Sequence, residues 1–119
     1  MVTKLGRFLR MLRLDRGELL KDMADKLSIT PSYLSSIENG KRNPSYDIVQ
    51  KISAVYQFDP ETHDQLMDAY YQTVQEIPIS LNGTTTAQSD LGAVFARRLN
   101  ELSEADIDAI RTILSKKDR

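Results

Sequence analysis

Hydroxyl-bearing and cationic side chains lie close together between residues 32 and 42. Residues 32–36 read SYLSS, and residues 39–42 read NGKR. Hydroxyl groups can donate or accept a hydrogen bond at any base edge, whereas Lys and Arg neutralise phosphates. This segment therefore carries the chemistry needed to contact a nucleic acid.

A helix over about residues 30–39 would place these hydroxyls on one side. Thr30 is suited to cap its start, and Pro31 suits its first position, where a missing N–H does no harm. Gly40 is expected to end it. Apolar side chains can face inward, which leaves the polar ones outward. The expected inward residues are Ile29, Leu34 and Ile37, and the expected outward residues are Ser32, Tyr33, Ser35 and Ser36.

Four further helices are expected around this one within residues 1–75. Apolar residues recur at helical spacing over about 3–15, 19–27, 45–57 and 60–75. A short helix before the polar one, joined to it by a tight turn, is the arrangement that fits a helix into the major groove. The sequence predicts an all-α domain with an exposed polar third helix.

The stretch from residue 5 to about residue 58 resembles the lambda-repressor-like, or Xre, helix-turn-helix family. The resemblance rests on Arg13, Gly17, the segment DMADKLSIT at 22–30, and SYLSSIENGKRNP at 32–44. It covers about half of the chain. It implies a five-helix DNA-binding fold, and it pairs Arg13 with Glu38 in a partly buried salt bridge.

The resemblance also assigns the DNA contacts. It places base reading on Pro31, Ser32, Tyr33 and Ser36. Phosphate contacts are assigned to Thr30, Asn39, Lys41 and Arg42. The family usually opens its second helix with Thr/Ser-Gln, whereas this chain has Leu19-Leu20. Either these leucines pack inward with the helix slightly re-aimed, or DNA is held by fewer contacts.

Charge is unevenly distributed along the chain. Residues 1–58 hold 10 Lys/Arg and 6 Asp/Glu, a balance of +4, and residues 59–119 hold 6 and 11, a balance of −5. A basic first half can meet a polyanion while an acidic segment faces away from it. The net charge of −1 therefore does not argue against nucleic-acid binding.

Several classes of protein are disfavoured by composition. The chain has no Cys and a single His, so no metal site and no cofactor are expected. No catalytic triad spacing or glycine-rich phosphate loop occurs, so we do not expect an enzyme. No segment approaches the roughly 20 apolar residues of a membrane span, and a cytoplasmic location with no membrane partner is expected.

Residues 76–119 are predicted to form a linker and two C-terminal helices that dimerise the protein. The IPISL segment at 77–81 alternates in polarity and could form a short strand, and Ser103 and Asp106 are spaced as a capping box. The residues expected at a dimer interface are Ile77, Ile79, Leu81, Leu91, Val94, Phe95 and Leu99.

The expected function is sequence-specific DNA binding by a homodimeric transcriptional regulator, most simply a repressor, on a pseudo-palindromic double-stranded operator. The alternative is an antitoxin, similar to the HigA-like group, that neutralises a partner toxin and regulates its own operon. An acidic stretch beside extra helices suits a basic toxin and suits dimerisation equally well.

Overall fold

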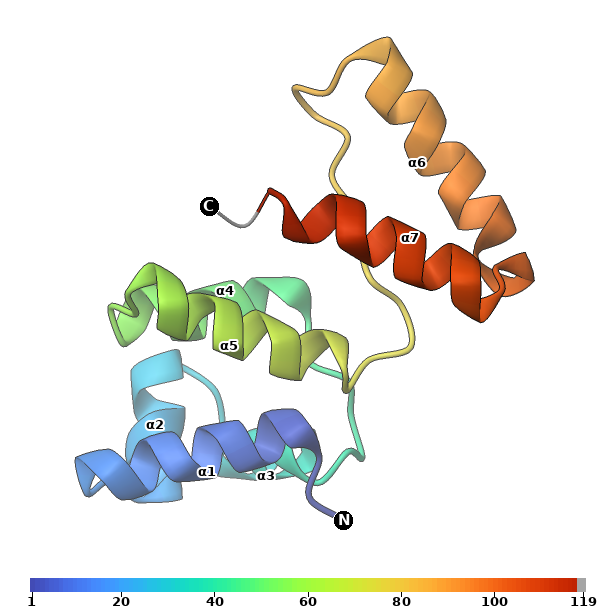
Figure 1. The fold of residues 1–119 in the computed structure, drawn as a ribbon. Coiled ribbons are helices and arrows are strands. Elements are labelled where there is room, and N and C mark those ends of the chain that lie inside the picture. The colour runs from blue at the N-terminus through green and yellow to red at the C-terminus, as the bar shows by residue number, and fades with distance from the viewer. Residues whose placement is uncertain (118–119) are drawn as a thin grey trace. The chain divides into compact units, whose positions relative to one another are not determined.

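The computed structural model describes residues 1–117, and these residues form helices and connecting loops without any strand. Contacts divide the chain into two compact units, Met1–Ile77 and Pro78–Arg119. The all-α prediction is confirmed (Figure 1). The short strand considered for the IPISL segment does not form: residues 77–81 have neither helical nor strand structure.

The first unit contains five helices. Their bounds are α1 Lys4–Arg16, α2 Leu20–Leu27, α3 Pro31–Glu38, α4 Tyr46–Val55 and α5 Pro60–Tyr71. α1 packs against α3 and α5, α2 packs against α3 and α4, and α4 packs against α5. α1 therefore lies between the polar helix and the acidic helix α5.

One apolar core joins all five helices of this unit. Burial of these side chains is the main term that holds short helices together, because none of the five is long enough to be stable alone. The buried core residues are Leu5, Leu9, Met23, Ala24, Leu27, Leu34, Ile37, Val49, Ile52, Tyr56, Leu66, Met67 and Tyr70.

The helix cap predicted at Thr30 is confirmed, and α4 and α5 begin with caps of the same kind. Thr30 Oγ1 accepts from Tyr33 N–H at 3.0 Å, and Ser45 Oγ accepts from Ile48 N–H at 3.1 Å. Asp59 Oδ1 accepts from Thr62 N–H at 2.7 Å, and hydrogen bonding from the Thr62 side chain and amide lowers the pKa of the Asp59 carboxyl. Each cap satisfies one of the amides that a helix start leaves unpaired.

A cluster around Tyr56 holds the loop between α1 and α2 against the end of α4. The Tyr56 hydroxyl donates to Glu18 Oε1 at 2.7 Å, and Lys26 forms an ion pair with the same carboxylate. Lys26 and Tyr56 lower the pKa of Glu18, while burial and Glu18 raise the pKa of Tyr56. These contacts fix the start of α2.

The second unit contains α6 Thr86–Arg98, the 3₁₀ turn η1 Leu99–Glu101 and α7 Glu104–Ser115. The capping box predicted at the start of α7 is confirmed: Ser103 Oγ accepts from Asp106 N–H at 3.1 Å, and Asp106 Oδ2 accepts from Ser103 N–H at 3.0 Å. None of the residues in these three elements is buried.

Gly6 gives a direct test of how closely α1 and α3 approach. A Cβ atom at Gly6 would lie 2.2 Å from the backbone oxygen of Glu38, a distance that forces the two helices apart. We expect Gly6→Ala to lower the free energy of unfolding by about 2 to 3 kcal/mol, measured by urea titration with circular dichroism.

The matched control is Gly92→Ala in α6, where a Cβ would meet Leu81 at an ordinary 3.4 Å. This change should be neutral or stabilising by up to about 1 kcal/mol, because Ala is the better helix former. Equal stability of the Gly6→Ala protein and the parent chain would show that the close approach is not a real constraint.

Candidate nucleic-acid interface

The polar face of α3 is exposed and begins at a capped helix start. Pro31 and Ser32 are exposed, and Tyr33 and Ser36 are half-buried. Leu34 and Ile37 are buried, as the sequence predicted, so the helix turns its apolar side to the core. Hydroxyl groups therefore line the outer side of a helix whose inner side is fixed.

These side chains surround a shallow hollow of about 220 Å³. It is lined by Thr30, Ser32, Tyr33, Ser36 and Arg42. The Arg42 guanidinium lies 5.8 Å from the centre of the Tyr33 ring, a cation–π geometry that draws the cation over the helix. This contact could not be predicted from the sequence. The nine-residue separation of Tyr33 and Arg42 carries no recognisable signal without the intervening turn.

Lys41 and Arg42 are held at the carboxyl end of α3 by the backbone. Gly40 adopts a left-handed conformation with φ of 75°. Beyond it, Lys41 N–H and Arg42 N–H both donate to the carbonyl of Ser36, at 2.9 and 3.3 Å. Both side chains are exposed, so two cations flank the hydroxyl face at a defined place.

The Asn39 side chain is hydrogen-bonded to the backbone at the carboxyl end of α3. Its side-chain Nδ2 donates to the carbonyl of Ser35 at 2.9 Å and lies 3.4 Å from Ser35 Oγ. Ser36 is also engaged, since its hydroxyl donates to the carbonyl of Ser32 at 3.0 Å. The Ser36 oxygen remains an acceptor, whereas an Asn39 contact to phosphate would require the carboxamide to turn.

A buried ion pair ties α3 to α1. The Arg13 Nη2 atom donates to Glu38 Oε1 at 3.0 Å, and Arg13 Nη1 donates to Glu38 Oε2. The Arg13 side chain is 10% exposed and that of Glu38 is 1% exposed. Arg10, which the sequence analysis did not assign, also contacts Glu38 Oε1 at 3.3 Å. Two Arg side chains therefore share one carboxylate.

The backbone adds a second tie at the same place. Thr3 N–H donates to the carbonyl of Glu38 at 3.0 Å, and Thr3 Oγ1 donates to it at 3.3 Å. The carboxyl end of α3 thus has its backbone oxygen and its side chain both engaged by the start and middle of α1. The orientation of the hydroxyl face depends on these contacts.

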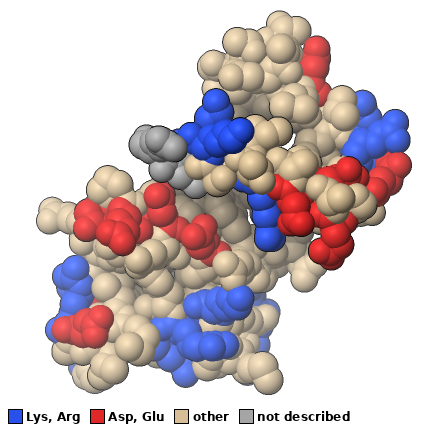
Figure 2. Space-filling view, viewed as in Figure 1, with Lys and Arg blue, Asp and Glu red and all other residues tan. Residues whose placement is uncertain are grey.

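Basic and acidic side chains gather on different parts of the first unit. Figure 2 shows Lys and Arg clustered over α1 and Asp and Glu clustered over α5. The exposed acidic residues of α5 are Glu61, Asp64 and Asp68. One of the two helices on which α3 packs, α1, is therefore basic, and the acidic helix α5 packs against α1 and α4.

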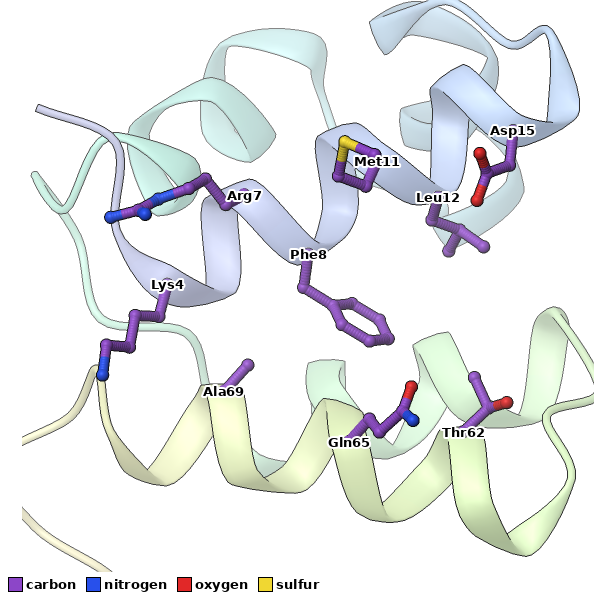
Figure 3. Close-up of a pocket in the computed structure, with 9 residues that line it drawn as sticks. All are labelled: Lys4, Arg7, Phe8, Met11, Leu12, Asp15, Thr62, Gln65 and Ala69. Atoms are coloured by element: carbon purple, nitrogen blue, oxygen red, sulfur yellow. The ribbon is translucent and has the colours of Figure 1, made fainter.

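A larger groove of about 540 Å³ lies between α1 and α5 (Figure 3). Phe8, Met11, Leu12 and Ala69 give it an apolar lining, with Lys4 and Arg7 towards one end of α1 and Asp15 towards the other. It is not lined by any residue of α3. The hydroxyl face is therefore separate from this groove.

The titratable groups of residues 1–117 do not form a candidate metal site. Nowhere in that range do three His, Cys, Asp or Glu side chains come together as a possible metal site. His63 is half-buried between α4 and α5, and its Nδ1 lies 2.7 Å from Ser53 Oγ. This contact forms because α4 packs against α5.

Leu19 and Leu20 differ in burial. Leu20 is half-buried and packs against the core, while Leu19 is 63% exposed at the start of α2. Only one of the two leucines packs inward. A polar side chain that could contact DNA is absent from both positions.

Comparison with known proteins gives a family match within the first unit and several similar proteins. The family model described as "Helix-turn-helix domain" matches residues 4–66. Among similar proteins are the HTH-type transcriptional regulator DdrOP3 of Deinococcus deserti, 43% identical over 53 residues, and the HTH-type transcriptional regulator SinR of Bacillus subtilis, 37% identical over 70 residues. No solved structure is significantly similar to the chain.

These matches are partial on both sides. The DdrOP3 match spans 44% of this chain and 41% of that protein, and the SinR match spans 58% of this chain and 60% of that protein.

Within residues 1–117, no helix is long and apolar enough to cross a membrane.

Replacing the buried residue Glu38 is expected to lower the free energy of unfolding far more than replacing the partly exposed Arg10. Glu38→Ala leaves the Arg13 guanidinium buried without a counter-charge, and we expect a loss of about 3 to 5 kcal/mol in unfolding free energy. Arg10→Ala removes only the arm whose side chain is 47% exposed, and we expect a loss below about 1 kcal/mol.

Urea unfolding followed by circular dichroism measures both changes. If the Glu38→Ala protein does not fold, Glu38→Gln, which keeps the shape and part of the hydrogen bonding, provides the comparison with Arg10→Ala. Losses of equal size for the Glu38 and Arg10 variants would contradict the assignment of Arg13–Glu38 as the dominant tie.

Proposed function

Because the chain belongs to the helix-turn-helix domain family, we propose that it is a transcriptional regulator, most simply a repressor, that binds an operator in double-stranded DNA. The observation that carries the proposal is the exposed hydroxyl face of α3, with Lys41 and Arg42 held beside it. An α-helix of this kind fits the major groove, where base edges are distinguishable.

Base reading is proposed for Pro31, Ser32, Tyr33 and Ser36. Ser32 has the freest hydroxyl, and the Tyr33 ring can contact a thymine methyl group. Phosphate contacts are proposed for Thr30, Asn39, Lys41 and Arg42. Cations at fixed positions beside the helix supply affinity and register, and the helix face supplies the choice of sequence.

The chain supplies one such helix, and we propose that a homodimer supplies two. The second unit supports this proposal because several of its apolar side chains are exposed in the single chain. Leu91 is 68%, Phe95 is 38% and Leu99 is 52% exposed. Two helices joined in this way would address two half-sites about 34 Å apart on a pseudo-palindrome. Ile77, Ile79, Leu81 and Val94 complete the proposed interface.

The acidic face of α5 favours a second candidate function, that of an antitoxin. Glu61, Asp64 and Asp68 form an exposed anionic surface on a helix that does not pack against α3, and such a surface suits a basic protein partner. A small basic protein that is encoded beside this chain and co-purifies with it would favour this candidate over a regulator that acts alone.

DNA binding is tested with duplexes selected from a random pool by the unaltered protein. Replacement of both Lys41 and Arg42 by Ala should reduce the slope of log affinity against log salt by about 2, because two phosphate contacts are lost. Ser32→Ala should leave that slope unchanged and weaken preference at one base position by about 1 kcal/mol.

The measurement is fluorescence anisotropy at several salt concentrations on the selected duplex and on single-base variants of it. A Ser32→Ala protein that binds all variants with the parental order of preference would remove Ser32 from the reading face. Absence of DNA binding by the unaltered protein would refute the proposed function itself.

Dimerisation is tested by light scattering after gel filtration. Phe95→Glu places a charge on the exposed apolar side of α6, and we expect it to convert a dimer into a monomer at micromolar concentration. Lys116→Gln, which lowers the net charge by the same one unit on an exposed side chain beyond α7, is the control and should leave the dimer intact. A monomeric parent chain at that concentration would contradict the proposed assembly.

A further inference from the structure

The start of α2 carries a carboxylate where the chain offers no polar side-chain cap. Leu19 precedes the helix and makes no side-chain cap hydrogen bond. Its backbone N–H donates instead to Asp22 Oδ2 at 2.8 Å. This edge of the helix-turn-helix therefore presents an exposed apolar side chain and an anionic group.

Asp22 differs from the neighbouring acid Glu18 in having no cationic partner among the ion pairs of residues 1–117. The Glu18 carboxylate is taken up by Lys26 and the Tyr56 hydroxyl. The charge of Asp22 is compensated only by the backbone amide and by the positive end of the helix. Asp22 is therefore an anion without an ion-pair partner at this edge.

Docking geometry brings this edge close to DNA. In a helix-turn-helix complex the second helix lies in the major groove and the first crosses the sugar–phosphate backbone. Here the first of these helices is α2 and the second is α3, and the two pack against each other. At physiological salt a carboxylate repels a phosphate that lies within roughly 8 Å of it, and the start of the helix that crosses the backbone is where such an approach is expected.

We propose that Asp22 limits the affinity of this protein for DNA, an inference that rests on the proposed function. The same carboxylate stabilises the fold, because it accepts the Leu19 amide and sits in the first turn of α2. Asp22 thus has opposite effects on two properties: it favours the folded state and disfavours the DNA-bound state.

The test is Asp22→Asn in the full chain, with Asp64→Asn as the control. Asp64 is an exposed acid on α5, so its replacement changes the net charge equally at a surface away from α3. Two probes are used: a 30-base-pair duplex selected by the parent protein and a duplex of unrelated sequence. Anisotropy gives Kd, and thermal unfolding gives Tm.

We expect Asp22→Asn to tighten binding to both duplexes by about fivefold, the effect of removing one charge near a phosphate at partly screened distance. Its Tm should fall by a few degrees. A purely structural residue would lose affinity along with stability, so the opposite signs identify the proposed role. Asp64→Asn should change Kd less than about 1.5-fold, since screening weakens distant charges.

Two outcomes overturn the inference while the proposed function stands: equal Kd values for the Asp22 and Asp64 variants, or weaker binding by Asp22→Asn, when the parent protein binds its selected duplex. Failure of the parent protein to bind either duplex overturns the proposed function and this inference together. The two failures are therefore distinguishable in one set of titrations.

Discussion

The position of α3 depends on one buried carboxylate. Glu38 pairs with Arg13 in the interior and with Arg10 at its margin, and its backbone oxygen is bound by Thr3. Desolvation offsets much of the attraction in a buried ion pair of this kind, whereas loss of one partner leaves the other charge buried and unpaired. Gly6 allows α1 and α3 to approach closely, and the ion pair sets the orientation of α3 relative to α1. The DNA recognition proposed for the hydroxyl face depends on that orientation.

Basic and acidic side chains lie on different helices of the first unit. The basic helix α1 lies beneath α3, and the acidic helix α5 lies against α1 and α4. Lys41 and Arg42 extend the positive side to the end of the reading helix. The start of α2 is the exception, since Asp22 and Leu19 occupy it. The net charge of −1 conceals this separation, and only the distribution of charges is informative about a polyanionic partner.

The all-α fold and most helix starts could be predicted from local chemistry. Thr30, Ser45, Asp59 and Ser103 are short polar residues followed by Pro or by helical periodicity, and their caps need no distant partner. Contacts between distant residues could not be predicted in this way. The Tyr33–Arg42 contact, the sharing of Glu38 by Arg10, and the Ser53–His63 hydrogen bond each depend on how helices meet. The roles of Leu19 and Leu20 also required packing to separate them, because adjacent leucines have equal propensity. The reading residues remain predictions that DNA binding must test.

The exposed apolar side of α6 and α7 has a consequence for gene dosage. Neither helix buries a residue within the single chain, so the stability of both helices is linked to the binding of a partner that covers their apolar side. For a protein that pairs through these helices, the species competent for an operator forms with the square of chain concentration. Halving synthesis would then reduce that species about fourfold in the dilute regime, by mass action. A weak self-association surface would thereby convert a gradual change in expression into a sharper change in promoter occupancy.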